Sequence, residues 1–95
     1  MNPYIHKKIS GNRFQRIFRE HTADSELVWH RDHCDRSISI IESNGWKFQA
    51  DNKLPVELKA GDTLHITANE YHRVIKGTGS LVVEITEHEA GNINK

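Results

Sequence analysis

The stretch Trp29-His30-Arg31-Asp32-His33-Cys34-Asp35-Arg36 holds two histidines, two aspartates, two arginines and the only cysteine of the chain, directly before the alternating run Ser37-Ile38-Ser39-Ile40. Successive side chains of a strand point to opposite faces, so the two isoleucines share one face and the two serines the other. A second polar group, Tyr71-His72-Arg73, follows another alternating run later in the chain. We expect the two polar groups to meet inside a small β-barrel and to form a polar pocket there.

The rest of the chain repeats this alternation between turn signals. The turns are indicated at Ser43-Asn44-Gly45, Asp51-Asn52-Lys53, Ala60-Gly61-Asp62 and Gly77-Thr78-Gly79-Ser80. No window places apolar residues at helical spacing over three turns. Short alternating runs between regular turns predict an all-β sandwich or barrel in one domain. We assign residues 1–12 to a polar N-terminal extension, 13–87 to the barrel, with its first strand at an edge, and 88–95 to a polar C-terminal tail.

Composition excludes several partners. Lysine plus arginine and aspartate plus glutamate number 13 each, so the chain has no basic field suited to nucleic acid or to an anionic membrane. No apolar run reaches the roughly 18 residues that span a bilayer, and the polar N-terminus lacks the apolar core of a signal peptide. The single Cys34 excludes an intrachain disulfide. We therefore expect a cytoplasmic protein that binds neither nucleic acid nor membrane.

Residue parity predicts which side chains face the interior. In the middle of the chain, the apolar residues of the inward phase have even numbers: Ile38, Ile40, Trp46, Phe48, Val56, Leu58, Leu64, Ile66 and Val74. The polar residues His30, Asp32, Arg36 and His72 have the same parity. We expect these four side chains to point into the barrel and the odd-numbered His65 to point outward.

With this order of strands, turns and polar groups, the chain resembles a small single-domain cupin, a barrel of the jelly-roll type. The second cupin motif runs from a glycine through Pro-x-Gly to a histidine. Gly61 and His72 stand at that spacing, with Thr67 and Asn69 in place of the proline and the second glycine. The resemblance covers roughly residues 25–87 and implies a small jelly-roll, cupin-like β-barrel.

The first cupin motif is matched less closely. His30 stands at its first histidine, Asp32 in place of its second histidine, Arg36 in place of its glutamate and Ser43 in place of its closing glycine. In cupins these histidines and the glutamate, with the later histidine, hold a divalent metal. The resemblance therefore implies Fe, Mn, Zn or Ni held by His30, Asp32 and His72, whereas Arg36 replaces the fourth ligand.

The residue types leave other interpretations open. Two histidines and one carboxylate are the facial ligand set of non-haem Fe(II) sites. Alternatively, Asp32 pairs with Arg36 and the histidines only form hydrogen bonds inside the barrel. A further alternative is a zinc-like cluster in which His33 and Cys34 join His30 as ligands.

Three classes of function follow from these interpretations. An enzyme requires the metal, a metal-free binding module requires Arg36 to be available for a small anionic ligand, and an interaction domain requires neither. Trp46 is either a core residue or a wall of the pocket, and we count it with Arg36 as a candidate ligand contact. Apolar residues on the outward phase, namely Trp29, Ile41, Tyr71 and Ile75, predict a homodimer.

Overall fold

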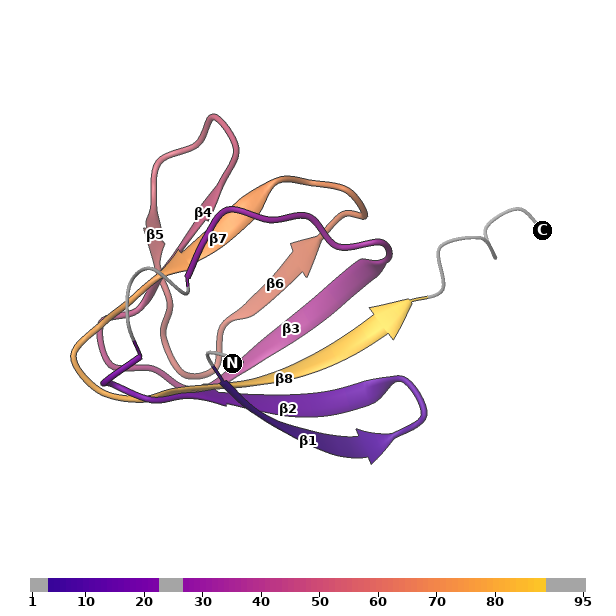
Figure 1. Ribbon diagram of the computed structural model, residues 1–95, viewed down its shortest axis with the longest axis horizontal. Coiled ribbons are helices and arrows are strands. Elements are labelled where there is room, and N and C mark those ends of the chain that lie inside the picture. Colours follow the sequence, from indigo (N-terminus) through magenta and orange to yellow (C-terminus); the bar gives the residue numbers. More distant parts are fainter. Residues whose placement is uncertain (1–3, 23–26, 89–95) are drawn as a thin grey trace.

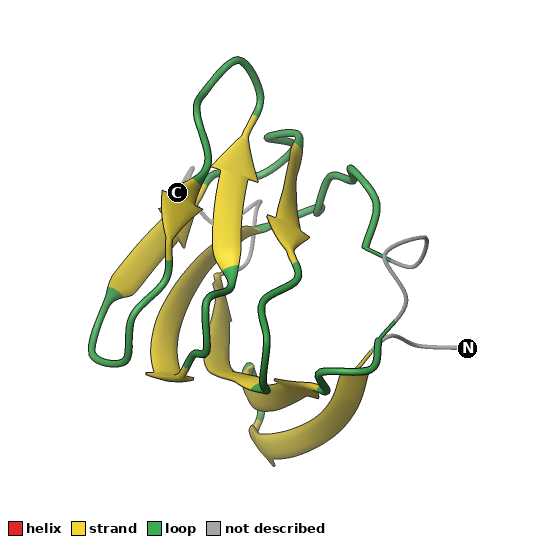
Figure 2. Ribbon diagram, turned by 90° about the vertical axis from the view of Figure 1, so that its left-hand side faces the viewer, coloured by secondary structure: helices red, strands yellow, loops and turns green. Residues whose placement is uncertain are grey.

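Two antiparallel β-sheets form the framework of the computed structural model, which describes residues 4–22 and 27–88 (Figure 1). The strands are β1 (Tyr4–Ser10), β2 (Arg13–Phe18), β3 (Asp35–Glu42), β4 (Lys47–Ala50), β5 (Val56–Glu57), β6 (Thr63–Ile66), β7 (His72–Ile75) and β8 (Leu81–His88). One sheet has the order β1-β2-β8-β3-β6 and the other β5-β4-β7. Figure 2 shows the two sheets curving around a common interior. The predicted all-β fold is confirmed.

The core lies between the sheets; from Ile38 to Val74 its members have the predicted even numbers, whereas β8 contributes the odd-numbered Leu81, Val83 and Ile85. Its buried members are Phe14, Phe18, Ile40, Trp46, Leu58, Leu81, Val83 and Ile85, with Ile38, Phe48, Leu64 and Val74 packed against them. His65 is exposed, as expected. Val56 is the exception, because 58% of it is exposed. It belongs to the two-residue strand β5 at the edge of the smaller sheet, where little structure is left to cover it.

Strand β3 allows a direct test of the inward phase. Ile40 is 2% exposed and Ser39, its neighbour on the opposite face, is half-buried. Ile40→Ala leaves a cavity in the core and should lower the free energy of unfolding by about 2–5 kcal/mol. Ser39→Ala should lower it by less than about 0.5 kcal/mol. Urea unfolding of both variants measures this, and the reverse ranking would contradict the assignment of faces.

The N-terminal segment is part of the larger sheet. Strand β1 pairs with β2 from Tyr4, opposite Phe18, to Ser10, opposite Arg13. Residues 4–10, which we had assigned to an extension, therefore form the edge strand, and β2 lies between β1 and β8. The inward face of β1 carries the polar His6 and Lys8 after Tyr4, so its sequence lacks the apolar alternation by which the other strands are identified. Strand β8 ends at His88, and residues 89–95 of the predicted tail lie outside the described residues.

No helix long and apolar enough to cross a membrane occurs in residues 4–22 and 27–88.

Candidate metal centre and ligand cavity

A two-residue β-bridge brings the two polar groups of the sequence together. The backbone N–H of His30 donates to the carbonyl of His72 at 2.9 Å, and the N–H of His72 donates to the carbonyl of His30 at 3.0 Å. Directly opposed residues of an antiparallel pair place their side chains on the same face. The two imidazole ring centroids accordingly lie 4.3 Å apart.

Two further contacts join the loop before β3 and the first residue of β3 to the loop before β7. The backbone N–H of Asn69 donates to the carbonyl of Asp32 at 2.7 Å, and the N–H of Ala68 donates to Oδ1 of Asp35 at 2.7 Å. Asn69 adopts a φ of 66°, a left-handed conformation that glycine and asparagine tolerate best. This explains in physical terms why Asn69 can stand where the cupin motif has glycine.

The hydrogen bonds of the histidines determine which ring nitrogen faces the cavity. Nδ1 of His30 lies 3.0 Å from the carbonyl of Val28, and Nδ1 of His72 lies 2.7 Å from the carbonyl of Glu70. A carbonyl only accepts, so Nδ1 carries the proton in both rings. The Nε2 atoms are left with their lone pairs when the rings are neutral, which is the tautomer that binds metals in this way.

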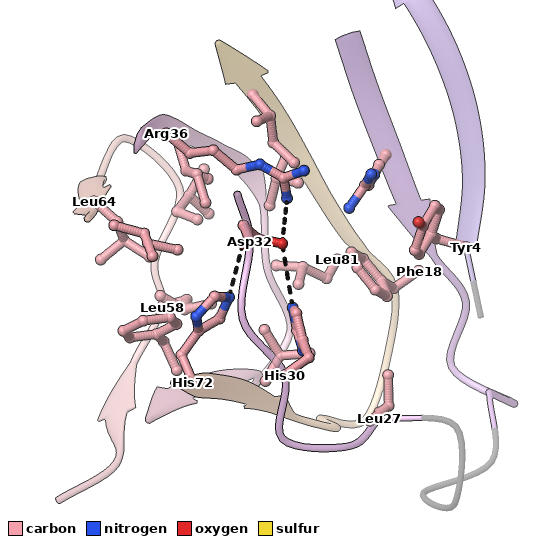
Figure 3. Close-up of a pocket in the computed structure, with 18 of the residues that line it drawn as sticks. Tyr4, Phe18, Leu27, His30, Asp32, Arg36, Leu58, Leu64, His72 and Leu81 are labelled. Atoms are coloured by element: carbon pink, nitrogen blue, oxygen red, sulfur yellow. Dashed lines mark ion pairs between the residues drawn. The ribbon is translucent and has the colours of Figure 1, made fainter. Parts of the chain in front are cut away.

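Asp32 lies between the two Nε2 atoms. Its Oδ2 is 3.2 Å from Nε2 of His72, and its Oδ1 is 3.9 Å from Nε2 of His30 (Figure 3). Oδ2 is buried and accepts no well-directed hydrogen bond within the described part of the chain, so we treat its contact with His72 as electrostatic. One ligand atom from each of the three residues lies within 4.8 Å of the others. Two imidazole nitrogens and a buried oxygen in need of a partner fit a divalent metal ion.

The same cluster shifts two pKa values in opposite directions. Burial alone would raise the pKa of Asp32, but the contact with His72 and the charge of Arg36 hold it below its ordinary value. Burial alone would lower the pKa of His72, but Asp32 and the carbonyl of Glu70 raise it above its ordinary value. A proton on Nε2 of His72 therefore occupies the position of the metal, so metal binding should release it.

A pH dependence of stability follows for the metal-free protein. Folding raises the pKa of His72, so the protonated ring stabilises the folded state. This stabilisation is fully present below the pKa of histidine in the unfolded chain, about 6.5, and is lost as the pH rises through the pKa of His72 in the folded protein. The free energy of unfolding of the parent should therefore be higher than that of Asp32→Asn. This difference should be largest near about pH 6 and smaller near about pH 8. Urea unfolding across this range measures the difference, and a constant or growing difference would contradict the assigned contact.

Arg36 contacts the same carboxylate. Its Nη1 lies 3.3 Å from Oδ1 of Asp32, and its Nη2 lies 2.6 Å from Oε2 of Glu87 (Figure 3 shows the first contact). Nε of Arg36 also donates to Oε2 of Glu87, at 3.1 Å. The predicted inward orientation of Arg36 is confirmed. Its guanidinium is engaged by two carboxylates, however, and it therefore competes with a metal for Asp32.

These side chains line a cavity of about 300 Å³ that is mostly apolar. Its lining comprises Tyr4, Arg16, Phe18, Leu27, Val28, His30, Asp32, Arg36, Ile38, Ile40, Phe48, Leu58, Leu64, Ile66, His72, Val74, Leu81, Val83 and Ile85. Trp46, which we counted as a candidate ligand contact, does not belong to this lining. It is fully buried in the core, and its Nε1 donates to the carbonyl of Gly79 at 2.8 Å.

The alternative zinc cluster is not formed in the part of the chain that the structure describes. The metal-capable group found there consists of His30, Asp32 and His72, without His33 or Cys34. His33 is exposed. Burial and the nearby charge of Glu87 raise the pKa of the Cys34 thiol, which disfavours the thiolate needed for metal binding.

Three residues near the site were missed by the sequence analysis: Tyr4, Arg16 and Glu87. Arg16 carried a usable signal, because Phe14, Arg16 and Phe18 alternate on the inward face of β2. Tyr4 was missed because its segment had been assigned to an extension. Glu87 follows the alternating part of β8, and only the pairing of β8 with β3 places it opposite Arg36.

Comparisons with known proteins support the fold. No family model and no curated protein matches the chain. A proposed mannose-6-phosphate isomerase of Ralstonia eutropha is 16% identical with a TM-score of 0.72, over 92% of this chain and 85% of that one. A cupin domain of Bordetella pertussis is 16% identical with a TM-score of 0.64, over 93% and 96%. HppE with Fe(II) is 12% identical with a TM-score of 0.64, over 80% of this chain and 41% of that one. The chain therefore has the fold of a small cupin.

Proposed function

We propose that this cupin-fold protein binds one divalent metal ion through His30, Asp32 and His72 and takes a small molecule into the adjoining cavity. The observation that carries the proposal is the convergence of two Nε2 lone pairs on a buried carboxylate oxygen that lacks a hydrogen bond. Both imidazoles are oriented by backbone carbonyls, which is the usual support of histidine ligands.

Three protein ligands leave coordination positions open on such an ion. When bound, the ion supplies a Lewis acid or, if it is Fe, a redox centre at the cavity. The chain's own residues shape the site around it. His30 is about half exposed, with 47% of its side chain accessible, so solvent reaches this edge of the cluster, whereas His72 is buried. The cupin-fold protein HppE contains Fe(II), which supports a metal-dependent enzyme as the form of this function.

A metal-free binding module is the second candidate, and the pairing of Arg36 with Asp32 favours it. A cation 3.3 Å from Oδ1 partly neutralises the carboxylate without any metal. In this alternative His72, protonated on Nε2, supplies the second positive charge beside Asp32, and the cavity takes a small molecule by itself.

Calorimetric titration of the chelator-treated protein with Mn(II), Fe(II), Zn(II) and Ni(II) distinguishes the two candidates. The parent should bind one ion per chain, and His30→Ala should bind it at least about tenfold more weakly, worth roughly 1.4 kcal/mol. His65→Ala is the matched control, because His65 is an exposed histidine outside the cluster. Absence of binding to the parent, or equal weakening by both substitutions, would contradict the metal site.

Arg36 should lower the affinity of the site for a divalent metal ion. Its guanidinium lies beside the ion's position and competes for Oδ1 of Asp32, and a cation near a dication is repulsive at a partly buried site. Arg36→Gln should therefore tighten binding of the same ions at least about tenfold, roughly 1.4 kcal/mol. Arg13→Gln is the control, because Arg13 pairs with Glu84 away from the cavity. Unchanged or weaker binding by Arg36→Gln would show that Arg36 does not oppose the metal.

We also propose a homodimer, although fewer exposed apolar residues support it than the sequence predicted for the outward face. Trp29 and Tyr71 stack on each other with ring centroids 5.4 Å apart, which partly covers both. Exposed apolar side chains remain on the larger sheet at Ile5, Ile9 and Ile41, and β1 is an edge strand able to pair with a second copy. Light scattering at micromolar concentration should give twice the chain mass, and a monomer would contradict the proposal.

A further inference from the structure

Arg16 is a cation in the cavity wall, and within residues 4–22 and 27–88 it forms no ion pair at contact distance, although Asp32 and Glu87 lie close enough to act on its charge. It lies on β2, opposite Val83 of β8, and its side chain lines the cavity. Its Nε is buried and donates no hydrogen bond within the described residues. The other arginine of the lining, Arg36, is satisfied by Asp32 and Glu87. A partly buried guanidinium that forms no ion pair is costly, and a ligand that supplies an anion would offset this cost.

Two aromatic rings contact the guanidinium of Arg16. The guanidinium carbon lies 4.2 Å from the ring centroid of Tyr4 and 4.9 Å from that of Phe14. Tyr4 packs edge-on against Phe18, which also lines the cavity. Stacking on ring faces fixes the plane of a guanidinium and leaves its N–H edge available for an oxyanion. Burial lowers the pKa of Arg16 from its ordinary value, so an anion beside it would recover lost charge stabilisation.

The remainder of the cavity is suited to a hydrocarbon chain. In Figure 3, Tyr4 and Phe18 lie on one side of Asp32, and Leu58 and Leu64 lie on the other. Apart from the two arginines, Tyr4 and the His30–Asp32–His72 cluster, the lining is apolar. Ligand sites of this kind combine an apolar wall with a few polar groups that fix the orientation.

We infer that the cavity binds a small aliphatic monocarboxylate, with its carboxylate paired to Arg16 and its chain against the apolar wall. A single negative charge matches Arg16, the arginine of the described lining that forms no ion pair at contact distance. The two charges of a phosphate monoester would leave excess negative charge close to Asp32 and Glu87. This inference deepens the proposed function and rests on it for the use of the cavity as a ligand site, but the contact with Arg16 does not require the metal.

Calorimetric titration with sodium hexanoate and with its neutral counterpart hexanamide tests the contact. The experiment uses chelator-treated protein and, separately, protein saturated with Zn(II). Chelator-treated parent should bind hexanoate at least about tenfold more tightly than hexanamide, as a charge-assisted pair allows. Arg16→Gln should abolish this preference, Arg16→Lys should keep part of it, and Arg13→Gln, on the same strand, should keep all of it. Circular dichroism establishes that each variant is folded.

Four kinds of result would overturn the inference. Equal binding of hexanoate and hexanamide by the parent, or no binding of either, would remove the carboxylate site. An equal loss in Arg16→Gln and Arg13→Gln would make the effect a general one of charge. Hexanoate binding that appears only with Zn(II) would make the carboxylate a metal ligand, which contradicts the role of Arg16 and leaves the proposed metal site intact. Tighter binding of hexyl phosphate than of hexanoate would overturn the choice of head group.

Discussion

Asp32→Asn should weaken the binding of divalent metal ions by at least about a hundredfold, roughly 2.8 kcal/mol. Asp32 is the only anionic member of the cluster, and its side chain is 10% exposed, so little water is available to replace it. An amide of the same size keeps the shape of the loop but supplies a neutral oxygen, which is a weak ligand for Fe, Mn, Zn or Ni. Calorimetric titration of chelator-treated parent and variant measures the loss.

The matched control for this prediction is Asp51→Asn. Asp51 lies exposed in the turn after β4, outside the cluster. Its substitution should leave metal affinity within about twofold of the parent, because exposed charges at a distance are screened by salt. If Asp51→Asn weakened binding as much as Asp32→Asn did, metal would be held by general surface charge and not by this cluster.

Trp46→Ala should have the largest effect on stability, about 3–5 kcal/mol. Trp46 is fully buried, packs against Phe18 with ring centroids 5.6 Å apart, and donates from Nε1 to the carbonyl of Gly79. Its own carbonyl accepts from the N–H of Leu58 at 2.9 Å. The side chain thus fills the core and binds the segment of Gly79, whereas the contact with Leu58 is made by the backbone. The total free energy of unfolding of a domain of this size is only about 5–15 kcal/mol, so the variant should be close to unfolding.

A second substitution separates the two roles of Trp46. Trp46→Phe keeps most of the volume but leaves the carbonyl of Gly79 without this donor, and it should lower the free energy of unfolding by about 1–3 kcal/mol. Urea unfolding followed by circular dichroism measures both variants. A loss of less than about 1 kcal/mol in Trp46→Ala would contradict the assignment of Trp46 to the core.

The fold was accessible from the sequence because strand alternation is a local property. Ile38, Ile40, Leu64 and Ile66 follow it on the two neighbouring strands β3 and β6, and parity placed them correctly. Val56 was placed wrongly, because alternation reports which face a residue occupies and not whether another element covers that face. Strand β1 was missed for a related reason, since an edge strand with His6 and Lys8 on its inward side resembles a polar extension.

Parity also placed His30, Asp32, Arg36 and His72 in one cavity, and the structure brings them together there. The ion pairs within the group depend on distances that the sequence does not contain. Glu87 engages Arg36 because β8 lies beside β3, and Arg16 enters the wall because β2 lies beside β8. Such neighbours are a property of sheet order. The orientation of each imidazole likewise depends on single carbonyls, those of Val28 and Glu70. The roles of the four residues in metal and ligand binding stay predictions.

The central claim is that Nε2 of His30 and Nε2 of His72 bind one metal ion together with Asp32. Long-range proton–nitrogen NMR spectra of the histidine side chains, recorded while Zn(II) is added to chelator-treated protein, test it most directly. We predict that both rings carry the proton on Nδ1 and that their Nε2 resonances shift together up to one equivalent of Zn(II). The resonances of exposed histidines such as His33 and His65 should stay unchanged. Unchanged Nε2 resonances of His30 and His72 at saturating Zn(II), or shifts confined to the exposed histidines, would contradict the claim.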